Sequence, residues 1–269
     1  MGCASRAGAG LVGRGARSGR DRAAGANDDR AVRLHGDQAQ GRCVPSRRGG
    51  RGGPGAGGGV PEQKLRIDPN CAWTVDTSIR LARELSGILE YLEDPTPGLD
   101  GMAEVARQTE IPLATNMCVV AFAHLRPAVR ADAVQVVLSD HHYWGGLRRS
   151  QLLGGICDTF GLGLSMHSNS HLGISLAAMT HLAAATPNLT YACDTHYPWK
   201  TEDVIKPGAL PFNSGSVRVP TAPGLGVELD EAALAELHEQ YLHSGLHKRD
   251  DTRYMRTFTS TFTPNTARW

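Results

Sequence analysis

Three oxygen-bearing side chains stand at the ends of successive apolar runs, where they could hold a metal ion. Asp68 ends one run, Glu93 the next and Asn116 the third. A carboxylate at the end of a buried strand is costly unless something cationic receives it. Two carboxylates and an amide oxygen suit a hard cation such as Mg²⁺, whereas zinc sites favour His and Cys. We therefore expect Asp68, Glu93 and Asn116 to bind Mg²⁺; the alternative is a solvated turn at Glu93 and Asp94, stopped by Pro95.

An acid–base pair follows further along the chain. Asp140 and His167 end the next two apolar runs. An Asp beside an imidazole fixes its tautomer and raises its basicity, which makes a general base. A lone His is more often a core residue bonded to the backbone. The metal trio and Asp140 favour the base interpretation for His167.

These residues recur at a near-constant spacing, which predicts the elements that position them. The intervals between successive end residues are 23 to 27 residues. This is the length of a strand, a helix and two short loops, and strands alternating with helices form parallel βα units. In a (β/α)8 barrel, functional residues lie at the C-terminal ends of successive strands. The sequence therefore predicts an α/β fold whose strands end at Asp68, Glu93, Asn116, Asp140, His167 and Asp194.

Composition gives no support for a nucleic-acid-binding, membrane or disulfide-rich protein. The 269 residues carry a formal charge of +1, which gives no reason to expect nucleic acid or an anionic membrane as partner. No apolar run approaches the length of a transmembrane helix. The six cysteines are scattered without a Cys-x-x-Cys pair, so we interpret them as reduced thiols of a cytoplasmic protein.

Residues 1–61 differ from the rest of the chain. They are rich in Gly and Arg and show neither a strand period nor a helix period, so they cannot bury enough apolar surface to fold alone. One interpretation is a disordered segment, with RNA binding or a transit peptide as minor alternatives. The other is a frame-shifted translation, because permitted codons for residues 30–60 allow an adjacent frame that reads as a strand ending in Lys-x-Lys and then a helix. DNA sequencing decides this question. Residues 62–269 are predicted to form a partial barrel with a C-terminal tail.

Five motifs resemble those of the glucarate dehydratases in the enolase superfamily. They are Arg66-Ile67-Asp68-Pro69-Asn70, Tyr91-Leu92-Glu93-Asp94-Pro95, Ala114-Thr115-Asn116-Met117, Ser139-Asp140-His141-His142-Tyr143-Trp144 and His167-Ser168-Asn169-Ser170-His171. The resemblance covers about Pro61 to Asp251. It implies strands 3–8 of a (β/α)7β barrel, of the kind found in mandelate racemase-like proteins. It also implies Mg²⁺ on Asp68, Glu93 and Asn116, and proton removal by His167 oriented by Asp140. Substrate contacts are implied for Asn70, Asn169, His196 and Arg249.

The implied reaction removes the proton α to a carboxylate of D-glucarate, or of L-idarate, and then eliminates water to give 5-keto-4-deoxyglucarate. Galactarate is an alternative substrate, and Arg249 could instead be a solvated charge at a helix end. The expected partner is a small aldarate, and a homo-oligomer is compatible with the sequence.

The sequence also departs from the family pattern. The capping domain and the first two barrel strands are expected to be missing, and Gln38-Ala39-Gln40 stands where the family has Lys-x-Lys. A non-catalytic remnant that associates with an intact homologue is therefore the rival interpretation. We expect the chain as written to be poorly soluble, or inactive if soluble.

Overall fold

The computed structural model describes residues 31–35, 39–40, 64–168, 170–245, 248 and 250–263. From residue 64 onward, strands and helices alternate as the spacing predicts. The alternating part consists of β3 (Leu65–Asp68), α1 (Val75–Glu84), β4 (Leu89–Glu93), α2 (Gly98–Gln108), β5 (Leu113–Thr115), α3 (Phe122–Ala131), β6 (Val136–Ser139), α4 (Leu147–Thr159), β7 (Gly163–Met166), α5 (Gly173–Ala184) and β8 (Cys193–Asp194).

A less regular part follows, with η1 (Tyr197–Trp199), β9 (Phe212–Asn213), β10 (Ser216–Arg218), α6 (Glu231–Ser244) and α7 (Asp251–Phe258). Within the described residues, no helix is long and apolar enough to cross a membrane.

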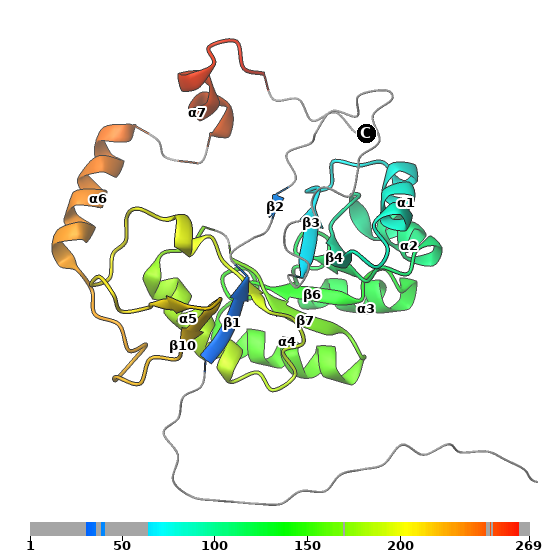
Figure 1. The fold of residues 1–269 in the computed structure, drawn as a ribbon, viewed down its shortest axis with the longest axis horizontal. Helices are drawn as coiled ribbons and strands as arrows, with labels where there is room; N and C mark the ends of the chain where they lie inside the picture. The colour runs from blue at the N-terminus through cyan, green and yellow to red at the C-terminus, as the bar shows by residue number, and fades with distance from the viewer. Residues whose placement is uncertain are drawn as a thin grey trace, which may run out of the picture.

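The strands form a parallel sheet in the order β2-β3-β4-β5-β6-β7, and helices α1 to α4 follow one another around its outer side (Figure 1). The register aligns the strand ends, because Ile67 pairs with Leu92 and Glu93 pairs with Ala114. The predicted α/β fold with parallel strands is confirmed.

Two short strands lie in the segment where the sequence predicted none. β2 (Ala39–Gln40) pairs in parallel with β3, with Gln40 opposite Asp68. β1 (Ala31–His35) pairs in parallel with β8 and antiparallel with β10, and it lies beside β10 in Figure 1. The expectation that no strand precedes β3 was therefore wrong for these residues. The remainder of residues 1–61 lies outside the described part, so disorder and the shifted frame stay predictions.

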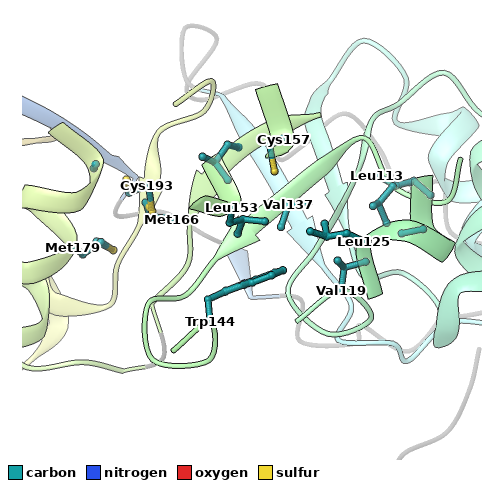
Figure 2. Packing of buried hydrophobic residues seen from close by; sticks show 14 of the residues in the cluster. Leu113, Val119, Leu125, Val137, Trp144, Leu153, Cys157, Met166, Met179 and Cys193 are labelled. Atoms are coloured by element: carbon teal, nitrogen blue, oxygen red, sulfur yellow. The ribbon is translucent and has the colours of Figure 1, made fainter. Parts of the chain in front are cut away.

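Apolar side chains bury both faces of the central strands. The larger cluster joins strand residues such as Leu92 and Val137 to residues of the outer helices, and Figure 2 shows Val137, Trp144 and Leu153 among its members. The smaller cluster consists of Tyr91, Ala114, Val136 and Leu138, with Tyr191 packed against it. Because successive strand residues point to opposite faces, this second cluster marks the inner face of the sheet.

Side chains cap the starts of two helices. Thr74 caps α1, because its Oγ1 accepts a hydrogen bond from Thr77 N at 3.3 Å, and Asp230 caps α6 through Ala233 N at 3.0 Å. Such caps satisfy backbone N–H groups that have no partner within the helix. Pro127 lies inside α3.

Gly163 provides a test of packing at the start of β7. A Cβ there would lie 2.7 Å from Tyr191 Cε2 and 3.2 Å from Val136 Cγ2. Gly163→Ala should therefore lower the free energy of unfolding by about 1–3 kcal/mol. Gly155, exposed on α4, has no atom within 4 Å of such a Cβ, so Gly155→Ala should raise it by about 0.5–1 kcal/mol. Urea unfolding of both variants measures the difference, and changes of equal sign would contradict the packing argument.

Candidate active site

The predicted functional residues continue the inner-facing series of each strand. Glu93 lies two residues beyond Tyr91, Asn116 two beyond Ala114 and Asp140 two beyond Leu138. Side chains two apart along a strand share a face. By the same alternation, Asp68 shares a face of the sheet with Arg66. The guanidinium carbon of Arg66 lies 4.5 Å from the centre of the Tyr91 ring, which belongs to the inner cluster. The strand ends therefore collect these polar groups at one edge of the inner face.

The trio Asp68, Glu93 and Asn116 comes together at the ends of β3, β4 and β5. Asn116 Nδ2 donates to Glu93 Oε1 at 2.5 Å, and Glu93 is only 1% exposed. Burial, and then the charges of Asp68 and Asp194, raise the pKa of Glu93 well above its usual range. Burial likewise raises the pKa of Asp68 to about 7. A buried and a partly buried carboxyl group that both resist ionisation next to one another fit a site that a divalent cation would complete.

Asp94 supports this trio, and the sequence assigned it no role. Its carboxylate accepts hydrogen bonds from Thr115 Oγ1 at 2.6 Å, Asn116 N at 2.8 Å and Met117 N at 3.1 Å. Asp94 is fully buried with φ at +35°, a conformation uncommon for residues other than glycine. It therefore fixes the backbone from which Asn116 projects. The Glu-Asp pair was visible in the sequence, but it did not show which carboxylate turns back to the chain.

His167 and Asp140 form the expected pair across β7 and β6. His167 Nδ1 lies 3.2 Å from Asp140 Oδ2, and Asp140 is 1% exposed. Burial opposes ionisation of Asp140, but hydrogen bonds from His167 and His142 outweigh it and lower its pKa to about 2. Burial also acts to lower the pKa of His167, but Asp140 and Asp194 outweigh it, so that pKa is raised. Because His167 Nδ1 is hydrogen-bonded to the Asp140 carboxylate, His167 Nε2 is the nitrogen that can take up a proton.

Asp194 is a second residue to which sequence reasoning gave no role. It is 3% exposed, and its Oδ1 accepts a hydrogen bond from Ser168 N at 2.8 Å. Its Oδ2 has no hydrogen-bond partner among the described residues. Burial raises the pKa of Asp194 to about 6. The repeat spacing located this residue, but the spacing alone did not reveal its electrostatic effect on His167.

The structure places only some of the predicted substrate residues. Asn70 lies beside the trio, since its N–H donates to Asp68 Oδ1 at 2.7 Å. His196 is half-buried, with its ring centre 5.7 Å from that of Trp199. Asn169 and Arg249 lie outside the described residues. The substrate contacts of all four stay predictions.

Comparisons with known proteins agree with this geometry. A family model described as "Enolase C-terminal domain-like" matches residues 56–233. A "Probable glucarate dehydratase" of Streptomyces coelicolor is 57% identical over 212 residues, which are 78% of this chain and 49% of that protein.

Two crystal structures of proteins named enolase are also similar. One from Mycobacterium smegmatis, complexed with tartrate, is 71% identical with a TM-score of 0.74 and covers 78% of this chain and 50% of its own. One from Gibberella zeae, complexed with magnesium, formate and sulfate, is 64% identical with a TM-score of 0.74. The match covers 78% of this chain and 49% of the G. zeae chain. The chain thus spans about half the length of these relatives.

Proposed function

The chain belongs to the enolase C-terminal domain-like family, and from this premise we propose that it supplies the catalytic part of an acid-sugar dehydratase acting on D-glucarate. The observation that carries the proposal is the pairing of His167 with buried Asp140 on the same inner face as the metal trio. A base with raised basicity near a cation site suits removal of a proton α to a carboxylate.

The residues of the chain divide the reaction between them. Asp68, Glu93 and Asn116 would hold Mg²⁺, which supplies positive charge to offset the negative charge that develops on the substrate carboxylate. His167 Nε2 accepts the α-proton, and the electrons of the C–H bond move toward that carboxylate. Their return expels the β-hydroxyl, which needs a proton, and His167 holds one after the first step. Asp140 keeps the imidazolium oriented and compensates its charge.

The substrate class rests on the relatives. The S. coelicolor protein is named a probable glucarate dehydratase, and the M. smegmatis structure holds tartrate, a dicarboxylic hydroxy acid. Both support an aldarate as the substrate. Galactarate and L-idarate are alternative substrates, because some of the predicted substrate-binding residues lie outside the described part of the chain.

An assay of two proteins tests the proposal. One is the chain itself, and the other is the chain preceded by the N-terminal half of the S. coelicolor relative. With Mg²⁺, the second should form the keto-deoxy product from D-glucarate, and the first should be inactive or insoluble. Product from galactarate alone would change the substrate, while no turnover of any aldarate by a folded fusion would support the non-catalytic interpretation. Gln38-Ala39-Gln40, in place of the Lys-x-Lys of the resemblance, favours that rival.

The pH dependence follows from the ionisation of His167. The base must be neutral to accept a proton, and its pKa is raised above the usual 6.5. We expect kcat/KM to rise about tenfold per pH unit below that pKa and then to level off. Asp140→Asn should move the rising limb to lower pH, because it removes the charge that favours the imidazolium. Rates measured from about pH 5 to 9 check this, and a profile that falls with pH over this limb would contradict it.

A further inference from the structure

A chain of hydrogen bonds continues from Asp140 away from the metal trio. Asp140 Oδ1 lies 2.7 Å from His142 Nδ1 and accepts a hydrogen bond from His142 N at 2.8 Å. Ser175 Oγ lies 2.7 Å from His142 Nε2 and 3.0 Å from His141 Nε2. Ser175 belongs to the first turn of α5, and it lines an open cavity of about 600 Å³ together with both imidazoles.

The positions of the protons along this chain follow from the donors available. Asp140 is ionised, so His142 Nδ1 must carry the hydrogen that lies between them. When His142 is neutral, its Nε2 is bare and accepts the hydrogen of Ser175. A hydroxyl has one hydrogen, so His141 Nε2 must donate its own to Ser175 Oγ. His141 is left with a bare Nδ1, and this buried atom has no partner among the described residues.

The same cluster of Asp140, His141 and His142 has ligand atoms within 4.8 Å of one another, as a metal site would. Both oxygens of Asp140, however, already accept N–H groups, one from His142 and one from His167. The Nε2 atoms of His141 and His142 are likewise joined through Ser175. This arrangement is that of a hydrogen-bond chain.

We propose that His142, held by Ser175, is a positioning residue that acts through Asp140 and moderates the basicity of His167. Asp140 serves two imidazoles, with one oxygen for each. Each N–H that a carboxylate accepts withdraws part of its negative charge, so the donor on Oδ1 weakens the pull of Oδ2 on the His167 proton. The backbone N–H of His142 also binds Oδ1, so losing the side chain should change the charge on Asp140 more than its position.

Other charged groups also act on this pair and must stay constant in a test. His167 faces Asp140 directly after β6, Asp194 on β8 and Asp68 on β3. His196, after β8, is influenced in turn by His167. On the far side, His171 and His141 lie toward His142, and burial lowers the pKa of both. None of these residues is altered in the variants below.

The test is an NMR titration of the His167 imidazole in the chain preceded by the N-terminal half of the S. coelicolor relative, with and without Mg²⁺. His142→Phe should raise the pKa of His167 by about 0.5 to 1 unit, because Asp140 loses a donor. His142→Asn should restore the original value, since its amide N–H can replace Nδ1–H. Ser175→Ala should give a smaller rise, because Nε2 of His142 loses its donor. His238→Phe, an exposed substitution on α6, should leave the pKa unchanged.

A fall or no change in the His167 pKa of His142→Phe would overturn the proposal. So would an equal shift in the Phe and Asn variants, which is the expectation for a structural role. If His142→Phe does not fold, Ser175→Ala tests the proposal instead. An unchanged pKa of His167 in Ser175→Ala would then refute it. The proposal deepens the dehydratase assignment and rests on His167 acting as its base. The titration needs no substrate, so lack of turnover with the expected shifts would count only against the assigned reaction.

Discussion

In the chain preceded by the N-terminal half of the S. coelicolor relative, replacing His167 by Asn should slow exchange of the α-proton of D-glucarate into deuterated water by about 10²- to 10⁴-fold. The reason is that Asn cannot accept the proton, although it can still donate to Asp140. Mg²⁺ binding should stay close to that of the unmodified protein, because His167 is not among the oxygen ligands. Exchange is followed by proton NMR and Mg²⁺ binding by calorimetry.

Two comparisons make this prediction specific to the base. Asp140→Asn should slow exchange in the same direction but leave more activity, since the imidazole remains and only its orientation and charge partner are lost. His243→Asn, an exposed substitution at the end of α6, should have no effect. If His167→Asn loses Mg²⁺ binding together with exchange, then His167 has a structural or ligand role instead.

The sequence was sufficient for the parallel strands and for the residues at their ends, because both depend on local periodicity. Strands buried on both faces are apolar runs, and the first polar residue after each run has to lie at the edge of the sheet. Asp68, Glu93, Asn116, Asp140 and His167 were found in this way. Their contacts depend on register, which pairs β3 with β4 and β6 with β7.

Three kinds of feature could not be read from the sequence. β2 is too short for a two-residue period to appear, and its pairing uses the backbone. Asp94 and His142 each follow a predicted site residue closely, but only the turn of the chain shows that one supports Asn116 and the other binds Asp140. The influence of Asp194 on His167 depends on burial and on the proximity of β7 and β8, both of which are tertiary.

Glu93→Gln should lower the Mg²⁺ affinity at least about 100-fold, because one of only two carboxylate ligands becomes neutral. Calorimetry of the chain preceded by the N-terminal half of the S. coelicolor relative measures this directly. Glu84→Gln, on the exposed face of α1, is the matched control and should bind Mg²⁺ as the unmodified chain does. Unchanged affinity in Glu93→Gln would exclude Glu93 from the metal site.

The same substitution should have the opposite effect on the metal-free fold. The pKa of Glu93 is raised, so its contribution to stability is full below its unfolded pKa and is lost as pH rises through its folded pKa. Above that pH an ionised, buried carboxylate destabilises the chain, and glutamine carries no such charge. Without Mg²⁺ at about pH 8, Glu93→Gln should therefore unfold at a higher temperature than the unmodified chain. Mg²⁺ at about 100 times its Kd should add about 2.7 kcal/mol to the unmodified chain and almost nothing to the variant. The variant should thus have the higher unfolding temperature without Mg²⁺, and the unmodified chain should have the higher one with Mg²⁺. This reversal is expected only if the Glu93 carboxylate destabilises the metal-free fold and also binds the metal.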